Sequence, residues 1–238
     1  MVTNKNLIIG GLVGVIEQGA ATGVQNEITS CTNNGKITVT PAGGNYARVG
    51  GIAAYIANAS NVVVNSCTND AGGEIYVNGT TTNYVYAGGI VGYSNANVGY
   101  SGNTNKAKIG GSSAGNYYVG GIWGLDAALG SGHTAKDITD NKNYGELYGT
   151  TADGKTHSVG GLFGAVASVA AANLKSDNTN YGNVTCAGGA LAGSSSIVWS
   201  GLVGTSVTVN GEEGAETTPA AKWLCPSENV TGSYVTEQ

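Results

Sequence analysis

The sequence has few charged residues and almost none of several side chains on which enzymes rely. Only 11% of its 238 residues are charged, and it contains a single arginine, Arg48, one methionine and one phenylalanine. This leaves little material for the positioned acids, bases and cations of a catalytic site. The formal net charge is -5, so we expect no basic stripe for a nucleic acid or an anionic membrane surface.

The sequence also lacks a long apolar run and a cysteine framework. Its most apolar stretch, residues 159–174, has 16 residues, whereas a membrane-spanning helix needs about 20. We therefore expect this stretch to form part of the hydrophobic core and not to insert into a membrane. No signal-peptide pattern opens the chain, so we expect any signal peptide or lipid anchor to have been removed. The four cysteines show no C-x-x-C pair, and they are Cys31, Cys67, Cys186 and Cys225.

What the chain has in abundance is glycine, with 41 residues, accompanied by many Asn, Thr, Val and Tyr residues. β-Branched and aromatic residues favour strands, and Gly and Asn favour turns. Good helix formers are scarce. The composition therefore predicts an all-β protein.

An internal repeat runs along the chain in the form Gly-Gly-(Ile/Leu)-x-(Gly/Ala). It occurs six times, the last copy being degraded, and the first residues of the copies are Gly10, Gly50, Gly88, Gly120, Gly160 and Ser200. The spacings are 40, 38, 32, 40 and 40 residues, which average 38. Such a period is typical of solenoid proteins.

A second signature follows each of the first five copies after about 20 residues, and it reads (Cys/Asn)-x-Asn, then Gly, then an aliphatic residue. The first positions are Cys31, Cys67, Asn103, Asn141 and Asn178; the asparagines are Asn33, Asn69, Asn105, Asn143 and Asn180; the aliphatic residues are Ile37, Ile75, Ile109, Leu147 and Val184. Two linked signatures in a constant order make a chance origin a poor explanation.

The repeat predicts a parallel β-helix, or β-solenoid, of about six units that we expect to be right-handed. Each unit offers two or three short strands that cannot bury their apolar faces alone, and stacking pairs their backbones with the units above and below. The repeats cover residues 1–204, starting near 7, 47, 85, 117, 157 and 197. Residues 205–238 lack the second signature, so we expect a cap or a linker to a further domain.

The repeated asparagines predict a structural column. Asparagine accepts left-handed backbone angles at turns, and stacked amides can hydrogen-bond along the solenoid axis. The alternative is a row of solvated turn residues, which is also structural. Cys31 and Cys67 fall in adjacent units, where a disulfide is conceivable by distance, but parallel neighbours point their Cβ atoms alike, and we expect reduced thiols.

Strand alternation places the aliphatic residue of each Gly-Gly motif inside and the next residue outside. The outer column is Val13, Ala53, Val91, Trp123, Phe163 and Val203. We expect it to be roofed by loops; the alternative is an exposed binding strip. Tyrosines also gather around the motif. The candidate binding residues are Trp123, Phe163, Tyr55 and Tyr93.

The paired signatures resemble the GLUG-motif repeats, here as Gly10-Gly11-Leu12-Val13-Gly14 followed by Cys31-x-Asn33-x-Gly35-x-Ile37. Such repeats occur in large surface and secreted proteins of gut and oral bacteria, including Bacteroides adhesin-like proteins and non-catalytic regions of some IgA-specific peptidases. The resemblance covers residues 7 to about 204. It implies an extracellular, cell-surface or secreted stalk or adhesive module that binds a host glycan or protein, or other domains of a larger surface protein.

The competing hypothesis is a glycan-binding or glycan-cleaving β-helix, whose site would need clustered acids with Arg or Lys. Here the histidines His133 and His157 fall in expected loops. The acids show no fixed pairing, and they are Asp126, Asp137, Asp140, Asp153 and Asp177. Residues 137–143 offer oxygen ligands but lack a calcium-loop spacing. We therefore expect no enzyme, no metal and no cofactor.

Overall fold

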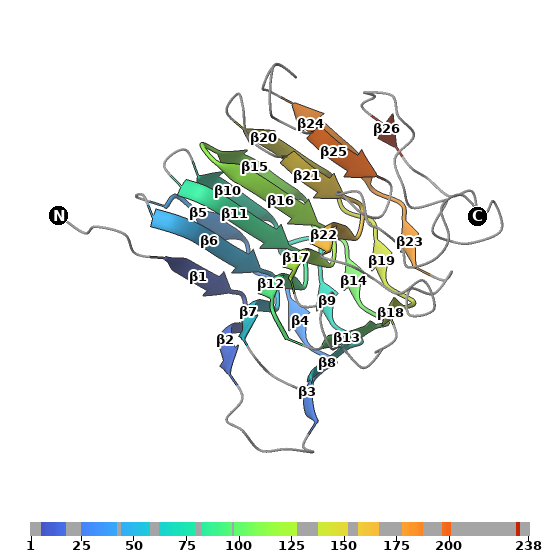
Figure 1. Cartoon of the computed structure of the whole chain (residues 1–238). Helices are drawn as coiled ribbons and strands as arrows, with labels where there is room; N and C mark the ends of the chain where they lie inside the picture. The colour runs from blue at the N-terminus through green and yellow to red at the C-terminus, as the bar shows by residue number, and fades with distance from the viewer. Residues whose placement is uncertain are drawn as a thin grey trace, which may run out of the picture.

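The computed structural model describes residues 6–17, 25–41, 44–57, 62–79, 82–96, 98–127, 138–151, 157–166, 178–187, 197–200 and 232–233. Every regular element in these ranges is a β-strand, and the strands form five stacked sheets (Figure 1). No helix in the described ranges is long and apolar enough to cross a membrane.

We name the sheets A to E in the order in which the chain visits them. Sheet A contains β1 (Leu7–Gly10), β6 (Gly44–Gly50), β11 (Thr82–Gly88), β16 (Asn116–Gly120), β21 (His157–Gly160) and β25 (Ile197–Ser200). Sheet B contains β2 (Val13–Glu17), β7 (Ala53–Ala57), β12 (Val91–Ser94), β17 (Trp123–Asp126) and β22 (Phe163–Val166). Sheet C contains β3 (Asn26–Thr29), β8 (Val62–Asn65), β13 (Val98–Ser101) and β18 (Ile138–Thr139).

The two remaining sheets carry the second signature. Sheet D contains β4 (Thr32–Asn33), β9 (Thr68–Asn69), β14 (Thr104–Asn105), β19 (Lys142–Asn143) and β23 (Thr179–Asn180). Sheet E contains β5 (Ile37–Val39), β10 (Ile75–Gly79), β15 (Ile109–Ser113), β20 (Leu147–Thr151), β24 (Asn183–Ala187) and β26 (Gly232–Ser233). Of residues 205–238, only β26 is described; it pairs antiparallel with β24, and the predicted cap or linker otherwise lies outside the described residues.

Strand register follows the sequence alignment of the repeats. Gly10 pairs with Gly50, which pairs with Gly88, and Asn33 pairs with Asn69, which pairs with Asn105. All the pairs between repeats are parallel, so the predicted all-β solenoid is confirmed. The count of six repeats and the right-handed coil stay predictions.

The cross-section holds two hydrophobic cores. One lies among sheets B and C and the Gly-Gly corner, and it includes Ile52, Val64, Ile90, Trp123 and Phe163. The other lies between sheets A and E and includes Val49, Val77, Val85, Ile109 and Leu147. Because sheets A and E face each other across this second core, their outer faces point in opposite directions.

The expected alternation of inner and outer residues at the Gly-Gly motif is wrong. Ile52 and Ala53 are consecutive, yet both are fully buried in the first core. The chain turns between β6 and β7, and the backbone N–H groups of both residues donate to the carbonyl oxygen of Ile90, at 3.0 and 2.9 Å. Two donors on one carbonyl break the two-residue period, as in a β-bulge, so the presumed outer column turns inward. Of that column, Val203 lies outside the described residues.

Close backbone packing explains each glycine of the motif. A Cβ atom on Gly50 would lie 1.9 Å from the carbonyl oxygen of Ala53, and one on Gly51 would lie 2.7 Å from Cγ of Asn69. A Cβ atom on Gly92, the last glycine of the third copy, would lie 2.7 Å from the backbone nitrogen of Val49. The Gly-Gly corner therefore packs directly against the asparagine turn of its own repeat, which links the two signatures.

We expect Gly89→Ala to lower the free energy of unfolding by about 1–3 kcal/mol, the usual cost of overpacking. The added methyl would lie 2.1 Å from the carbonyl oxygen of Gly121 and 2.6 Å from Oδ1 of Asn105. The matched control is Gly14→Ala, because a Cβ atom there has no neighbour within 4 Å. Urea denaturation of both variants measures the difference, and equal stabilities would refute a steric requirement at the corner.

Candidate functional site

The repeated asparagines form a continuous hydrogen-bonded column, which we call the asparagine ladder. Its members are Asn33, Asn69, Asn105, Asn143 and Asn180, and all five are buried. The Nδ2 group of each asparagine donates to Oδ1 of the next, with N–O distances of 2.8, 2.9, 2.7 and 2.8 Å along the column. The ladder therefore joins successive repeats through side chains as well as through backbone pairing.

Each amide of the ladder is also bonded to its own turn. In the fourth repeat, Nδ2 of Asn143 donates to the carbonyl oxygen of Gly145 at 2.9 Å, and Oδ1 accepts from the backbone N–H of Gly145 at 3.2 Å. The amide thus uses both N–H donors and both acceptor positions, which offsets the cost of burying a polar group.

The left-handed backbone angles expected for the asparagines occur three residues earlier. Positive φ values are found at Ser30 (53°), Ser66 (53°), Gly102 (62°) and Asp140 (51°), at the turn from sheet C to sheet D. The asparagines lie in short extended strands. The expectation that the asparagines adopt left-handed backbone angles is therefore wrong, because the turn and the ladder are formed by different residues.

A second amide column runs beside the first at the leading position of the signature, and the sequence analysis did not foresee it. Nδ2 of Asn103 donates to Oδ1 of Asn141 at 2.9 Å, and Asn141 repeats this bond to Asn178 at 2.9 Å. Cys31 and Cys67 occupy the same column in the first two repeats, and both are free thiols. The signal that could have revealed it was the run of three asparagines that replaces cysteine at this aligned position from the third repeat onward.

The structure does not present Trp123 and Phe163, two of the candidate binding residues, to solvent. Both side chains are fully buried, and their rings stack with centroids 3.8 Å apart. Tyr100, from sheet C, covers Trp123 at 4.2 Å between ring centroids. Because the corner turns this column inward, the two rings fill the first core; strands cover them where loops were expected, and the alternative of an exposed binding strip does not hold for these two residues.

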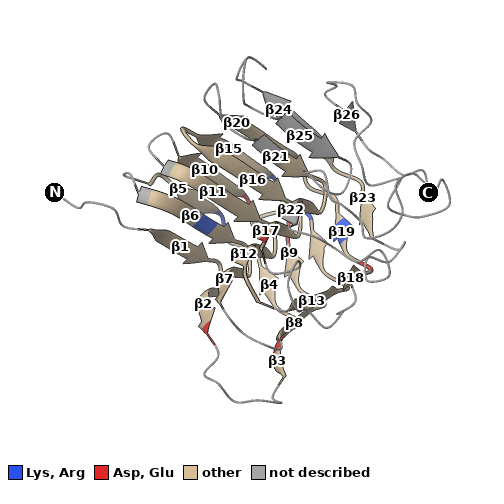
Figure 2. Cartoon of the chain, in the orientation of Figure 1, with Lys and Arg blue, Asp and Glu red and all other residues tan. Residues whose placement is uncertain are grey.

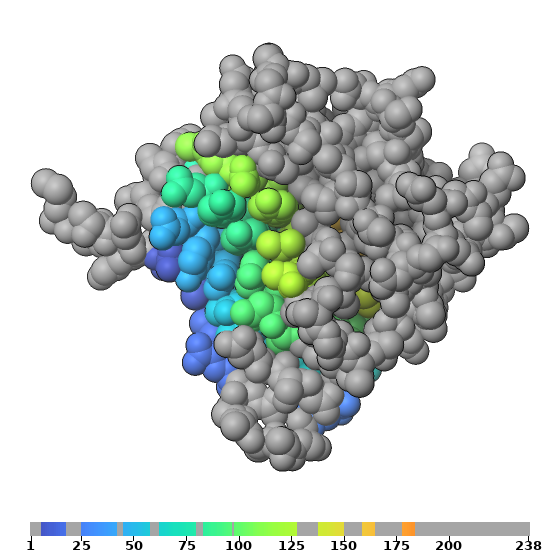
Figure 3. Space-filling view, viewed as in Figure 1, coloured from blue at the N-terminus to red at the C-terminus, as the bar shows by residue number. Residues whose placement is uncertain are grey.

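Tyr55 and Tyr93, the other candidates, belong to a half-exposed aromatic group that we call the tyrosine–arginine cluster. It comprises Arg48, Tyr46, Tyr55, Tyr84, Tyr86, Tyr93 and Tyr118, from sheets A and B. The rings of Tyr46, Tyr55 and Tyr93 surround the Arg48 guanidinium, with their centroids 4.0, 3.9 and 4.1 Å from Cζ. Figure 3 shows the described residues on this side of the molecule, coloured from blue near the N-terminus to yellow-green.

Ring-to-ring contacts extend the cluster along the solenoid axis. Tyr86 stacks on Tyr118 with centroids 5.3 Å apart and meets Tyr93 edge-on at 5.0 Å. Tyr84 lies parallel to Tyr86 at 6.2 Å and is the most exposed ring, at 40%. The aromatic row therefore crosses three neighbouring strands, β6, β11 and β16.

Arg48 is an isolated cation in this cluster. Its side chain is only 9% exposed, and its Nε atom is buried without a hydrogen-bond partner. The described strands of sheet A contain no other Lys, Arg, Asp or Glu, so the basic segment of β6 in Figure 2 is Arg48. Burial raises the pKa of Tyr86 and Tyr93, and the nearby Arg48 charge only partly opposes this. The phenols therefore remain neutral hydrogen-bond donors.

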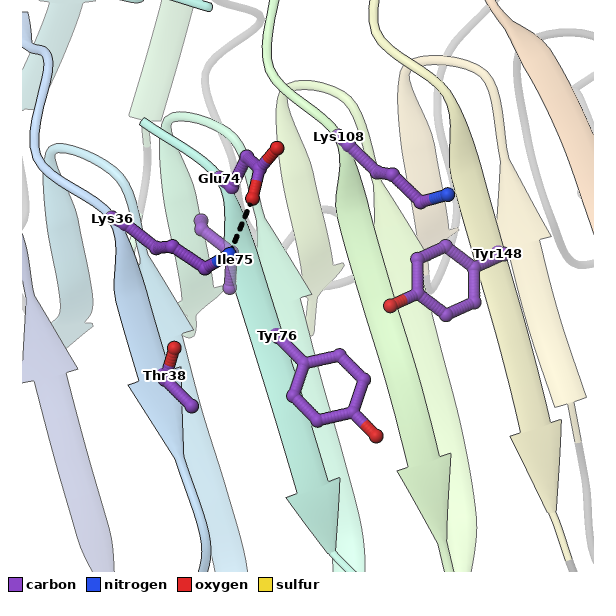
Figure 4. Close-up of a pocket in the computed structure, with 7 residues that line it drawn as sticks. All are labelled: Lys36, Thr38, Glu74, Ile75, Tyr76, Lys108 and Tyr148. Atoms are coloured by element: carbon purple, nitrogen blue, oxygen red, sulfur yellow. Dashed lines mark hydrogen bonds and ion pairs between the residues drawn. The ribbon is translucent and has the colours of Figure 1, made fainter. Parts of the chain in front are cut away.

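The outer face of sheet E carries a shallow groove of about 260 Å³ (Figure 4). Tyr76 and Tyr148 flank Gly110 in strand register, and the Tyr148 ring lies over Gly110, where a Cβ atom would fall 2.4 Å from Cδ1 of the ring. Lys36 donates to Glu74 at 2.7 Å, and Lys108 lies 4.8 Å from the Tyr148 ring centroid. The hydrogen bond from Lys36 lowers the pKa of Glu74, and burial raises that of Tyr148.

The acids considered above do not converge in the described part of the chain. Asp126 is buried and accepts from the Tyr100 hydroxyl at 3.5 Å, whereas Asp140 pairs with Lys142 at 2.7 Å. His133, Asp137, Asp153 and Asp177 lie outside the described residues, as does the side chain of His157. Among the described residues, no group of three potential metal ligands occurs.

We expect Asn105→Ala to lower the free energy of unfolding by about 1–3 kcal/mol, because it leaves a buried ladder amide without its hydrogen-bond partner in each of the two neighbouring repeats. Nδ2 of Asn69 loses its acceptor, and Oδ1 of Asn143 loses its donor. Asn83→Ala serves as the control, since Asn83 is exposed. Chemical denaturation followed by circular dichroism gives both values; a loss no larger than that of the control would show that the ladder adds no stability.

Burial raises the pKa of the Cys67 thiol to about 11. Because the folded pKa lies above the unfolded value, the stability contributed by the neutral thiol is lost as the pH rises above about 9. We expect Cys67 to resist iodoacetamide at pH 8 until urea unfolds the protein, with mass spectrometry locating the label. Cys67→Asn, which introduces the residue found at position 103, removes this titration; an identical alkaline loss of stability in both proteins would contradict the assignment.

Comparisons with known proteins leave the family open. No family model matches the chain, and no curated protein or solved structure matches it. The resemblance to GLUG-motif repeats therefore stays a prediction that rests on the two signatures.

Proposed function

We propose that this chain is a non-enzymatic extracellular repeat module, a cell-surface or secreted stalk or adhesin that presents a binding surface to host or neighbouring-cell ligands. Its solenoid has six repeats and a right-handed coil in this proposal, and it needs no cofactor. Its partners are a host glycan, a host protein or other domains of a larger surface protein, with no nucleic acid among them.

The observation that carries this proposal is the tyrosine–arginine cluster. Tyrosine offers an apolar ring face and a polar hydroxyl on a side chain with little conformational freedom, so it suits a binding surface. Here the rings contact one another and Arg48, and they project from strands paired on both sides. Such a surface is held in place before a ligand arrives, which reduces the entropy lost on binding.

The solenoid supports the stalk part of the proposal. Side-chain amides and backbone pairs both join each repeat to the next, so a load along the axis is shared by many parallel bonds. Salt bridges also cross between repeats at the surface, at Lys36–Glu74 and Lys108–Glu146, although exposed pairs of this kind contribute little stability.

A second candidate function, glycan binding in the sheet E groove, is favoured by the two tyrosine rings flanking Gly110. Paired Lys and Glu side chains at the rim offer donors and acceptors for the hydroxyl groups of a neutral sugar. Cleavage is less well supported, since a general acid needs a raised pKa and Lys36 lowers that of Glu74.

We expect the chain to bind members of a printed glycan array or immobilised extracellular-matrix proteins without turnover. Tyr84→Ala should weaken that binding at least tenfold, because it removes the most exposed ring of the cluster. Tyr144→Ala, which removes another exposed tyrosine outside the cluster, should have no effect. Selective loss in Tyr76→Ala would instead assign binding to the sheet E groove. Release of sugar products, or no binding by the unmodified chain, would refute the proposal.

A further inference from the structure

We propose that Arg48 is the centre of a binding site for an acidic sugar, whose anionic group pairs with the guanidinium while its ring packs on the neighbouring tyrosines. This inference rests on the proposed function, because it names the ligand class of the same cluster. It goes beyond the proposed function in two ways. It assigns recognition of the ligand to the charge of Arg48, and it gives the tyrosine rings the separate role of packing on the sugar ring.

Among the described residues, the charge of Arg48 has no partner. The side chain is nine-tenths buried, its Nε atom has no hydrogen-bond partner, and no carboxylate of the described residues forms an ion pair with it. Burying a charge without a counterion is costly. The three surrounding rings recover part of that cost through cation–π attraction, but they satisfy none of its N–H groups. An anion would complete the site.

The tyrosine rings around Arg48 restrict the direction from which an anion can approach. A guanidinium is planar, and aromatic rings stack on its faces, whereas its N–H groups point outward in the plane. The rings of Tyr46, Tyr55 and Tyr93 all lie within 4.1 Å of Cζ. Because Nε is buried and Arg48 is only 9% exposed, an anion that reaches the terminal N–H groups must be a small group such as a carboxylate or a sulfate.

A platform of tyrosine rings lies beside the charge of Arg48. Arg48 pairs in register with Tyr86, which pairs with Tyr118, and Tyr46 pairs with Tyr84. The ring faces of Tyr86 and Tyr118 stack, and Tyr84 exposes 40% of its surface. A sugar presents C–H groups that pack on aromatic faces and hydroxyl groups that accept from neutral phenols. An acidic monosaccharide therefore matches both halves of the cluster.

The arrangement fits one isolated anion better than a polyanion such as a nucleic acid. Sheet A carries one formal charge in its described strands, and the whole chain is negative at -5. A phosphate backbone gains affinity from several cations together, and this face offers one. A single acid group beside an aromatic platform is the pattern that Arg48 and its tyrosines complement.

The test uses calorimetric titration of the whole chain with three probes: hyaluronan oligosaccharides, which carry carboxylates without sulfates; dextran sulfate, which carries sulfates without carboxylates; and neutral dextran. We expect an acidic probe to bind and dextran not to bind. Binding of hyaluronan identifies the anion as a carboxylate, and binding of dextran sulfate alone identifies it as a sulfate. Equal binding of neutral dextran, or no binding of either acidic probe, would overturn the inference.

Two substitutions separate a ligand site from a structural cation. Arg48→Met retains an unbranched apolar stem but removes the charge, and Arg48→Lys retains the charge but loses the two-pronged hydrogen bonding. We expect at least a tenfold loss of acidic-probe binding for Met and a smaller loss for Lys. Thermal unfolding of the Met variant should occur at or above the temperature of the unmodified chain, since an unpaired buried charge is removed.

A lower unfolding temperature for Arg48→Met, together with acidic-probe binding that this variant leaves unchanged, would show that the guanidinium only holds the rings together. Failure of this inference can be distinguished from failure of the proposed function. The chain could bind neutral glycans or matrix proteins with an affinity that Tyr84→Ala weakens and Arg48→Met leaves unchanged. That result would refute the acidic-sugar site and leave the adhesive function intact. No binding of any array member, matrix protein or acidic probe would refute both.

Discussion

The contact between the Gly-Gly corner and the asparagine ladder is the constraint on which the rest of the structure depends. In each of the first four repeats the second glycine lies against the ladder asparagine, so close that a Cβ atom would fall 2.6–2.9 Å from its side chain. The corner can therefore approach the turn only where glycine stands, and the turn can be buried only because its amide is fully hydrogen-bonded. Two signatures some 20 residues apart in sequence are thus the two sides of one contact.

This contact divides the cross-section and determines which surfaces remain for binding. On one side, sheets B and C enclose a core that takes in Trp123, Phe163 and Tyr100. On the other, sheets A and E enclose a core of mainly aliphatic residues such as Val49 and Val85, with the buried ring of Tyr117. Large aromatic residues at the corner are buried in the core and are therefore not exposed for binding. Tyrosines that remain exposed include Tyr84 on the outer face of sheet A and Tyr76 on the outer face of sheet E.

Several features could be predicted from the sequence because they repeat in register. Parallel stacking places like residues above one another, so an aligned asparagine must tolerate another asparagine as its neighbour, and Asn33 and Asn69 bond as that reasoning implies. Features that depend on backbone direction could not be predicted. Strand alternation placed Trp123 outside, but two N–H groups share one carbonyl at the corner, and this shifts the period. The left-handed turn falls at Ser30 and Ser66, which no strong local preference marks.

The sequence by itself determined the all-β class, the period, the pairing of equivalent strands and the identity of the amide column, because each follows from one residue type recurring at one position. Only the tertiary structure decided which side chains meet across different strands. Arg48 and Tyr93 are 45 positions apart and lie on two different sheets, yet the Tyr93 ring centroid lies 4.1 Å from the guanidinium carbon. The angle at which the corner joins sheets A and B sets that distance, and the angle results from glycine packing that no pattern of hydrophobic and polar residues encodes.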